Sequence, residues 1–192
     1  MKTIGVNGFG RIGRYFTRLT LESAEVNVAV VNDLAPIATL AHLLKYDSIH
    51  RGLKHSFVIE GNHLVFENGK RIIFISEKQP ENIQWANYGV EIVLESTGLF
   101  LTTEAASKHL IGGAKKVVIS APANSEEIKT IVLGVNDEIL ESTDVIISNA
   151  SCTTNNAAPM VKVMLELCNI ESAYITTIHS YTSDQRLHDA PH

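Results

Sequence analysis

The sequence predicts an α/β fold, in which a mostly parallel β-sheet is covered by helices on both faces. Short β-branched runs alternate with segments whose apolar residues repeat every three to four positions, as when strands alternate with amphipathic helices. Runs such as 25–33 and 89–97 are almost continuously apolar, which is typical of strands buried on both faces. A glycine-rich turn joins the first strand-like run to the first helical segment.

The elements are expected in the following order. Ile4 and Val6 indicate a strand, and the glycine-rich turn, a helix and a second strand complete residues 1–33. Between residues 55 and 75, Asn68-Gly69 separates two apolar runs and predicts a β-hairpin. Further helices are predicted over 37–47, 102–114 and 155–168, the last with Pro159 in its first turn, and further strands over 89–97, 115–120, 130–136, 144–151 and 172–182.

A domain boundary is expected near residue 150, where the chain enters a new helix and a different kind of strand. Residues 1–150 would form the first domain. Residues 151–192 would begin a second, α+β domain and are too few for a core of their own. The final residues carry no helical pattern and resemble part of a loop, so we expect a truncated chain or part of a larger protein.

The composition excludes several classes of protein. With 45% hydrophobic residues, 19% charged residues and a net charge of −5, the chain is ordinarily globular and offers no surface for nucleic acid. No apolar run is long enough for a membrane helix, and the N-terminus lacks the apolar segment of a signal peptide. We therefore expect a soluble, cytoplasmic protein without a nucleic-acid or membrane partner.

The cysteines and histidines do not suggest a metal site. The two cysteines, Cys152 and Cys168, are too far apart for a C-x-x-C pair, and a disulfide is not expected in a reducing compartment. Cys168 lies in an apolar-periodic stretch and is expected to be a small buried hydrophobic residue. Six histidines do not cluster at ligand spacing: His42, His50, His55, His63, His188 and His192.

The glycine-rich turn predicts a dinucleotide site. Gly8, Gly10 and Gly13 form a G-x-G-x-x-G motif between a strand and a helix, and Asp33 follows 20 positions later at the end of the next strand. In a Rossmann-type fold these glycines allow the tight turn, the approach of pyrophosphate and the packing of helix on strand. The carboxylate would bind a ribose hydroxyl, which favours NAD over NADP. The alternatives are a generic tight turn for the glycines and a strand-end turn residue for Asp33.

Cys152 is a candidate nucleophile, because it sits where a strand ends and a helix begins, and the helix N-terminus favours a thiolate. Its candidate base is His179, although a lone histidine on an apolar strand is more often part of a core. The nearby hydroxyls of Ser151, Thr153 and Thr182 could bind an oxyanion or phosphate, or could merely cap and turn. A dinucleotide site and a thiol nucleophile together suggest an aldehyde dehydrogenase that works through a thioester.

Several motifs resemble one enzyme family in the same order along the chain. The segment SNASCTTN at 148–155 is similar to that of the phosphorylating glyceraldehyde-3-phosphate dehydrogenases. The same family is resembled by residues 6–14 and by HLLKYDS at 42–48, ESTG at 95–98, SAP at 120–122 and HSYTSDQRLHDAPH at 179–192. The resemblance covers the whole chain and corresponds to the cofactor domain and the opening of the catalytic domain.

The resemblance implies a role for each matching residue. Cys152 would attack the aldehyde carbon of glyceraldehyde 3-phosphate, and His179 would act as base and lower the pKa of the thiol. Ser151 and Thr153 would help to bind the inorganic phosphate that cleaves the thioester, and Thr182 the phosphate of the substrate. Positions that would line the NAD site are Arg11, Ile12, Asp33, Lys78, Thr97, Gly98 and Ser120. The family is usually a cytoplasmic homotetramer.

Two departures limit the resemblance. Asn156 stands where many members carry a second cysteine, which removes a resolving thiol but not the catalytic one. The C-terminal part of the family's catalytic domain is missing, so we expect this chain alone not to be a competent enzyme. Two other functions remain open: the related erythrose-4-phosphate dehydrogenase, which releases its acid by hydrolysis, and a non-catalytic cofactor-binding or interaction fragment.

Overall fold

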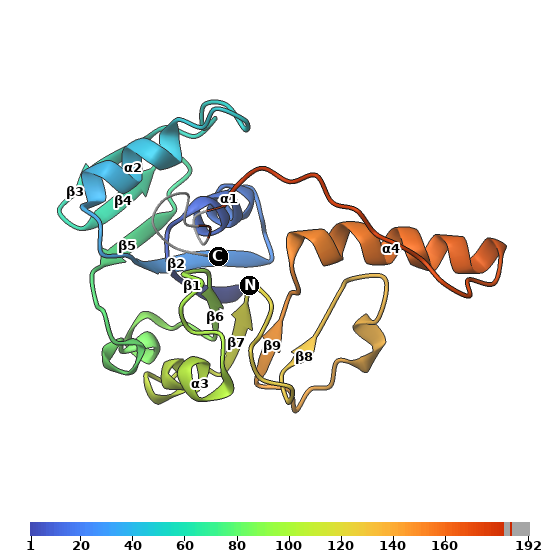
Figure 1. The fold of residues 1–192 in the computed structure, drawn as a ribbon. Coiled ribbons are helices and arrows are strands. Elements are labelled where there is room, and N and C mark those ends of the chain that lie inside the picture. Colours follow the sequence, from blue (N-terminus) through green and yellow to red (C-terminus); the bar gives the residue numbers. More distant parts are fainter. Residues whose placement is uncertain (183–184, 186–192) are drawn as a thin grey trace.

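The computed structural model describes residues 1–182 and 185, so most of the 179–192 motif lies outside the described residues (Figure 1). In this part of the chain one nine-stranded sheet has the order β3-β4-β5-β2-β1-β6-β7-β9-β8. The strands are β1 (Lys2–Asn7), β2 (Val26–Asn32), β3 (Phe57–Glu60), β4 (His63–Phe66), β5 (Arg71–Ile75), β6 (Ile92–Glu95), β7 (Lys116–Ile119), β8 (Lys129–Thr130) and β9 (Ile146–Ser148).

The sheet is mixed but mostly parallel. Along the sheet, each neighbouring pair in the series β5-β2-β1-β6-β7-β9-β8 is parallel. At the other end, β3, β4 and β5 form an antiparallel meander. The predicted hairpin is confirmed, since β4 and β5 are joined through Gly69 at φ +84°. The order β5-β2-β1-β6-β7-β9 is that of a Rossmann-type fold. The predicted α/β class is therefore confirmed.

Helices cover both faces of this sheet. The helices are α1 (Arg11–Thr20), α2 (Ile37–Lys45), α3 (Thr103–Ile111) and α4 (Cys152–Leu167), with short 3₁₀ turns at Pro80–Asn82, Trp85–Tyr88 and Asp137–Ile139. Helices α1 and α2 lie on one face, and α3 and the first two 3₁₀ turns lie on the other (Figure 1). Leu40 and Leu44 belong to the core under α2, whereas Trp85 and Ala106 belong to cores of the opposite face.

The winding of the chain creates a switch point beside β1. From β1 the chain first builds β2 and β5 outward on one side, and then returns to build β6, β7 and β9 on the other. The loops that leave the carboxyl ends of β1 and β6 therefore diverge to opposite faces. In open α/β sheets, ligands bind in the crevice that this divergence creates.

Two predicted strands are wrong. The segment 172–182 forms no strand and is almost entirely exposed, although its residues favour β-structure. A strand needs a hydrogen-bonded neighbour, and no strand of the described chain pairs with this segment. The strand expected over 130–136 is reduced to β8, because the side chain of Asn136 turns the chain back by bonding Val132 N–H and Thr130 C=O.

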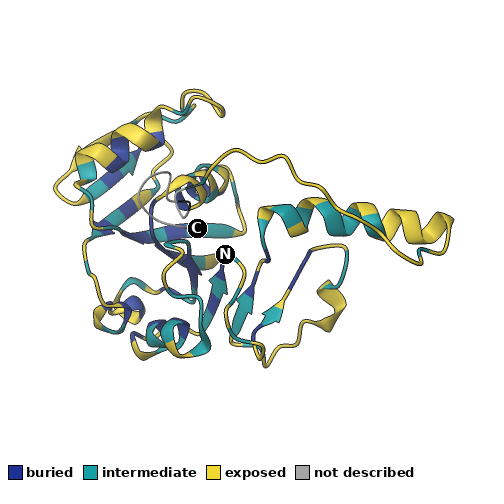
Figure 2. Cartoon of the chain, viewed as in Figure 1, coloured by how far each residue is buried: buried dark blue, intermediate teal, exposed yellow. Residues whose placement is uncertain are grey.

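Helix α4 also departs from the prediction. It begins at Cys152 because Ser151 caps it, so Pro159 lies in the helix interior and not in the first turn. Cys168 was expected to be buried but is exposed: it directly follows α4, a helix that buries none of its residues. The helix extends away from the sheet and buries none of its residues (Figure 2). Within residues 1–182 and 185, the helices are too short or too polar for any of them to span a bilayer.

Candidate functional site

The glycine-rich turn is held tightly between β1 and α1. Gly8 has φ +90°, and a Cβ atom there would lie 2.8 Å from Thr97 N. A Cβ on Gly13 would lie 2.2 Å from the carbonyl oxygen of Gly8, so the first turn of α1 can approach the strand only without a side chain. Gly10 faces open space. The turn therefore presents bare backbone at the N-terminus of α1, where an anion is favoured.

Asp33 stands beside this turn with its carboxylate fixed by backbone. Its Oδ2 accepts a hydrogen bond from Phe9 N (2.7 Å), and its Oδ1 accepts one from Ala35 N (2.9 Å). The side chain is half-buried at the end of β2. Each oxygen retains a further lone pair, so the carboxylate can still accept a hydroxyl group.

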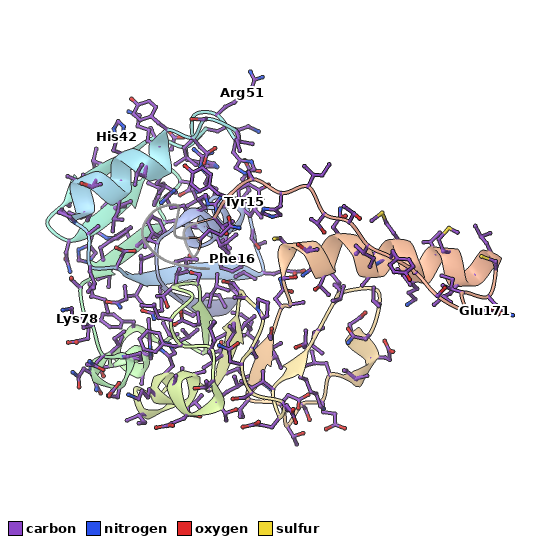
Figure 3. All side chains as sticks on the ribbon, in the orientation of Figure 1. Tyr15, Phe16, His42, Arg51, Lys78 and Glu171 are labelled. Carbon is purple, nitrogen blue, oxygen red and sulfur yellow. The ribbon has the colours of Figure 1, made fainter. Side chains whose placement is uncertain are left out.

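The other expected cofactor residues lie along the same edge of the sheet, because each follows the carboxyl end of a parallel strand. Arg11 and Ile12 are exposed at the start of α1, and Lys78 after β5 points to solvent (Figure 3). Thr97 and Gly98 follow β6, and Gly98 has φ +75°. Ser120 follows β7 and donates its N–H to Glu95 O (2.9 Å).

Cys152 lies on this edge as well, after β9, and it contacts His179. The distance between Cys152 Sγ and His179 Nε2 is 3.2 Å. The segment that carries His179 leaves the far end of α4, which Glu171 marks in Figure 3, and runs back along the helix to reach the cysteine. Residues 27 positions apart are thereby brought into hydrogen-bond contact.

The contact changes the pKa of both groups in the direction that favours an ion pair. The hydrogen bond to His179 lowers the pKa of the Cys152 thiol, and the hydroxyl and N–H of Thr153 lower it further. The carbonyl of Ser180, which accepts from Nδ1, raises the pKa of His179, and Cys152 raises it again. Cys152 is also the first residue of α4, where the helix dipole stabilises a thiolate.

The three hydroxyl residues have different surroundings. Ser151 caps α4: its Oγ accepts the N–H of Thr154 (2.9 Å) and contacts the Thr154 hydroxyl (2.8 Å). Thr153 lies beside the thiol. The backbone N–H of Thr182 donates to Oε1 of Gln185 (2.9 Å). Ser151 and Thr153 thus adjoin Cys152, whereas the contacts described for Thr182 are with Gln185.

Comparison with known proteins supports one family throughout. Residues 2–103 match the family model described as "Glyceraldehyde 3-phosphate dehydrogenase, NAD binding domain", and residues 151–192 match that of the C-terminal domain. A glyceraldehyde-3-phosphate dehydrogenase of Geobacillus stearothermophilus is 54% identical over 190 residues, which are 98% of this chain and 56% of the relative.

The chain belongs to the glyceraldehyde-3-phosphate dehydrogenase family. Its residues 2–103 are the NAD-binding domain of that family. Similar relatives are glyceraldehyde-3-phosphate dehydrogenase of Mycoplasma pneumoniae (50% identical, 98% of this chain and 56% of the relative) and glyceraldehyde-3-phosphate dehydrogenase 1 of Bacillus subtilis (51%, 98% and 56%). The chain spans about half the length of the curated relatives that it matches.

Hydrogen bonds that the sequence did not predict hold the loop before Cys152, residues 148–151. Ala150 adopts a left-handed conformation, φ +58°, which costs a non-glycine residue about 1 kcal/mol. Its N–H donates to Ser148 Oγ (3.1 Å), and Ser148 Oγ in turn donates to Ala121 O (2.7 Å). Asn155 donates to Asn149 O (2.6 Å) and Ser151 O (3.0 Å). The type of residue at position 150 gives no sign of this turn.

A buried carboxylate was missed as well. Glu95 ends β6 and is 1% exposed, and it contacts His109, which is fully buried. Its sequence signal is an acidic residue closing an apolar run. In the described part of the chain, His, Cys, Asp and Glu side chains do not gather in groups of three or more that could hold a metal ion.

Proposed function

We propose that the protein oxidises and phosphorylates glyceraldehyde 3-phosphate to 1,3-bisphosphoglycerate, with NAD as cofactor and inorganic phosphate as co-substrate. The observation that carries the proposal is the contact of 3.2 Å between Cys152 Sγ and His179 Nε2 at the start of α4. This contact lies on the same sheet edge as the glycine-rich turn. A nucleophile and a dinucleotide site on one edge fit an aldehyde dehydrogenase that works through a thioester.

The cofactor site fits NAD on the geometry of this chain. Gly8 and Gly13 exclude side chains from the turn, and Gly10 leaves space above it, so backbone can contact a pyrophosphate. Arg11, Ile12, Lys78, Thr97, Gly98 and Ser120 would line the remainder of the groove. Asp33 would bind the ribose hydroxyls, and its negative charge would repel the 2′-phosphate of NADP. When bound, NAD supplies the acceptor for the hydride of the aldehyde.

The residues of the chain would act in two stages. In the first, the Cys152 thiolate attacks the aldehyde carbon while protonated His179 gives its proton to the aldehyde oxygen. Neutral His179 would then take that hydroxyl proton back as the carbon loses its hydride and the thioester forms. In the second, an oxygen of inorganic phosphate attacks the thioester carbonyl and Cys152 leaves as a thiolate. Ser151 and Thr153 would hold that phosphate, because both lie beside the thiol. Thr182 would hold the phosphate of the substrate.

The domain organisation and assembly are part of the same proposal. Residues 1–150 would form the NAD-binding domain and 151–192 the opening of the catalytic domain, with a cytoplasmic homotetramer as the working form. The family resemblance supports this assembly. Light scattering on a chimera that continues residues 1–182 into the remainder of the Geobacillus stearothermophilus relative would show four subunits.

The first test is the reactivity of the thiol. Alkylation of Cys152 with iodoacetamide, followed against pH by mass spectrometry, should show a pKa below the ordinary value of a cysteine, about 8.5. Cys168 is a matched control, because it is also exposed and lacks a histidine partner among its described contacts. Equal pH profiles for the two cysteines would contradict an activated Cys152.

The second test is turnover of the chimera with glyceraldehyde 3-phosphate and NAD. Formation of NADH should require inorganic phosphate and should be lost in the Cys152→Ser variant. Turnover that is indifferent to phosphate would indicate a hydrolytic relative, such as erythrose-4-phosphate dehydrogenase. A chimera that binds NAD with an intact thiol but reduces none would favour a non-catalytic binding role.

A further inference from the structure

A chain of buried polar side chains crosses the sheet at the switch point. Asn32, Asn7 and Glu95 are the last residues of three adjacent strands, β2, β1 and β6, and they are 5%, 2% and 1% exposed. His109 of α3 continues the chain on the far side and is fully buried, as is Trp85. Burying a polar group without a hydrogen-bond partner lowers stability, so each donor in this chain must meet an acceptor.

The direction of each hydrogen bond on the His109 side is fixed by Trp85. An indole N–H can only donate, so His109 Nδ1 accepts from Trp85 Nε1 (3.2 Å). The ring proton of His109 therefore resides on Nε2. From there it is donated to Glu95 Oε2, at 2.9 Å.

The direction on the asparagine side is fixed by a backbone amide. The N–H of Glu77 donates to Asn32 Oδ1 (2.8 Å), which assigns Nδ2 of Asn32 as the donor to Asn7 Oδ1 (2.7 Å). Nδ2 of Asn7 then donates to Glu95 Oε2 (2.6 Å). Two series of hydrogen bonds, one that starts at Trp85 Nε1 and one that starts at the backbone N–H of Glu77, thus both end on Oε2 of Glu95.

The other oxygen of Glu95 holds the segment that follows β6. Oε1 accepts the backbone N–H of Thr97 (2.8 Å) and also the Thr97 hydroxyl. The Thr97 hydroxyl oxygen accepts the N–H of Leu99 through a lone pair (3.0 Å). This bond leaves the O–H proton of Thr97 available for donation to Glu95. All four groups around Glu95 are donors, so only a carboxylate, which accepts at both oxygens, satisfies them all.

The segment held by Glu95 forms a wall of the glycine-rich turn. Ser96 Oγ donates to the carbonyl oxygen of Gly8 (2.7 Å). Thr97 packs so closely on Gly8 that a Cβ there would lie 2.8 Å from both Thr97 N and Thr97 Cγ2. A shift of residues 96–99 would therefore move the surface that would contact a pyrophosphate.

We propose that Glu95 is a positioning residue for the dinucleotide: it holds residues 96–99 against Gly8 and so sets the affinity for NAD. This inference rests on the proposed function, because it assigns NAD to the turn. Glu95 does not itself face the groove, since it is 1% exposed and both its oxygens accept hydrogen bonds from groups of the protein. It acts through Thr97.

The test is Glu95→Gln in the 192-residue chain, with Glu91→Gln as the matched control. Glutamine keeps the shape but turns an NH₂ group toward either the Thr97 donors or the Asn7 and His109 donors, which leaves one set unmatched. Glu91 lies just before the same strand, is only partly buried and pairs with Lys2 and Lys115, far from the turn.

Three measurements are made on each chain. Calorimetric titration gives the dissociation constant for NAD, which should rise about tenfold in Glu95→Gln and stay unchanged in Glu91→Gln. Hydrogen exchange without ligand should be faster at the amides of Thr97 and Leu99 in Glu95→Gln. The fluorescence of Trp85, the single tryptophan of the sequence, should shift only if the series of hydrogen bonds through His109 is disturbed.

Unchanged exchange at Thr97 and Leu99, or an unchanged NAD affinity in a folded Glu95→Gln chain, would overturn the proposal. If Glu95→Gln does not fold, Glu95→Asp replaces it, because it keeps both acceptor oxygens but draws them back by one methylene from the donors of Thr97. It should speed hydrogen exchange at the amides of Thr97 and Leu99 and weaken NAD binding, and an unchanged NAD affinity would overturn the proposal.

A separate result would identify failure of the proposed function. If the unaltered chain binds no NAD, the assignment of NAD to this turn fails, and the cofactor role of Glu95 fails with it. The exchange rates of Thr97 and Leu99 would then still decide whether Glu95 holds residues 96–99.

Discussion

The sheet region, residues 1–150, and the cysteine region, residues 151–182, contribute to the same edge but are built in different ways. The sheet region holds its functional groups on strand ends above a buried core, and its supports are side chains that are almost fully buried, such as Asn7 and Glu95. In the cysteine region, α4 buries none of its residues and Cys152 and His179 are both exposed.

The comparison shows that the groups around the glycine-rich turn and the Cys152–His179 pair are held in place by different means. The sheet edge that carries the turn is fixed by buried hydrogen bonds that water cannot replace easily. The Cys152–His179 pair depends on one contact of 3.2 Å between the start of a helix and an exposed segment. We therefore expect substitutions in the sheet region to change global stability, and those in the cysteine region to change local chemistry.

The largest contrast should come from matched leucines. Leu44 of α2 is fully buried, and Leu165 of α4 is 55% exposed. Leu44→Ala should lower the free energy of unfolding by about 3 kcal/mol, because it leaves a cavity, whereas Leu165→Ala should change it by less than about 0.5 kcal/mol. Urea denaturation measures both. Equal losses would mean that α4 is packed as tightly as the sheet region.

A smaller stability loss is expected from the glycine-rich turn. Gly13→Ala places a Cβ 2.2 Å from a backbone carbonyl and should cost about 2–3 kcal/mol. Gly10→Ala meets open space and should cost less than about 1 kcal/mol. Thermal unfolding of the two variants compares them directly. If both were tolerated alike, the turn would be less tightly held than its contacts indicate.

His179→Asn should change chemistry without changing the fold. The hydrogen bond to His179 is the largest cause of the lowered Cys152 pKa, so its loss should raise that pKa toward the ordinary value. Less thiolate is then present at neutral pH, and the alkylation rate there should fall about tenfold. At a pH well above the ordinary thiol pKa the two rates should converge; a fall of equal size at every pH would point to a change of access.

The smallest contrast uses the two helix caps. Thr102 Oγ1 accepts from Ala105 N at the start of α3 (3.2 Å), and Ser151 Oγ accepts from Thr154 N at the start of α4 (2.9 Å). Thr102→Ala should lower global stability by about 1 kcal/mol. Ser151→Ala should leave the unfolding midpoint nearly unchanged and should speed hydrogen exchange in the first turn of α4 only. A lower midpoint for Ser151→Ala would show that α4 unfolds together with the sheet.

The sequence predicted the elements whose signals are local. Ile4, Val6 and the continuous apolar run at 25–33 predicted β1 and β2, and Thr102 marked the start of α3 correctly. The segment 172–182 was predicted wrongly because β-propensity says nothing about whether a partner strand is present. Cys168 was predicted wrongly because an apolar pattern on α4 shows which face would be buried, not whether anything covers it.

The tight turn of the candidate site was predictable because its motif carries its own spacing, as at Gly8, Gly10 and Gly13. The supports of the site were not. Glu95, Asn7 and His109 come from three elements, and only the folded sheet shows that they form one hydrogen-bonded chain. The left-handed turn at Ala150 is imposed by Ser148 and its neighbours, so the alanine itself gives no indication of it.

The position of β1 in the middle of the sheet has a consequence for the order of folding. Its pairing with β2 closes a short stretch of chain, whereas the bond between Asn7 and Glu95 joins residues 88 positions apart. Short loops close sooner than long ones, so β1, α1 and β2 are expected to associate first. The glycine-rich turn would then form before β6 brings residues 96–99 against Gly8. An early folding intermediate would therefore present only half of the dinucleotide groove.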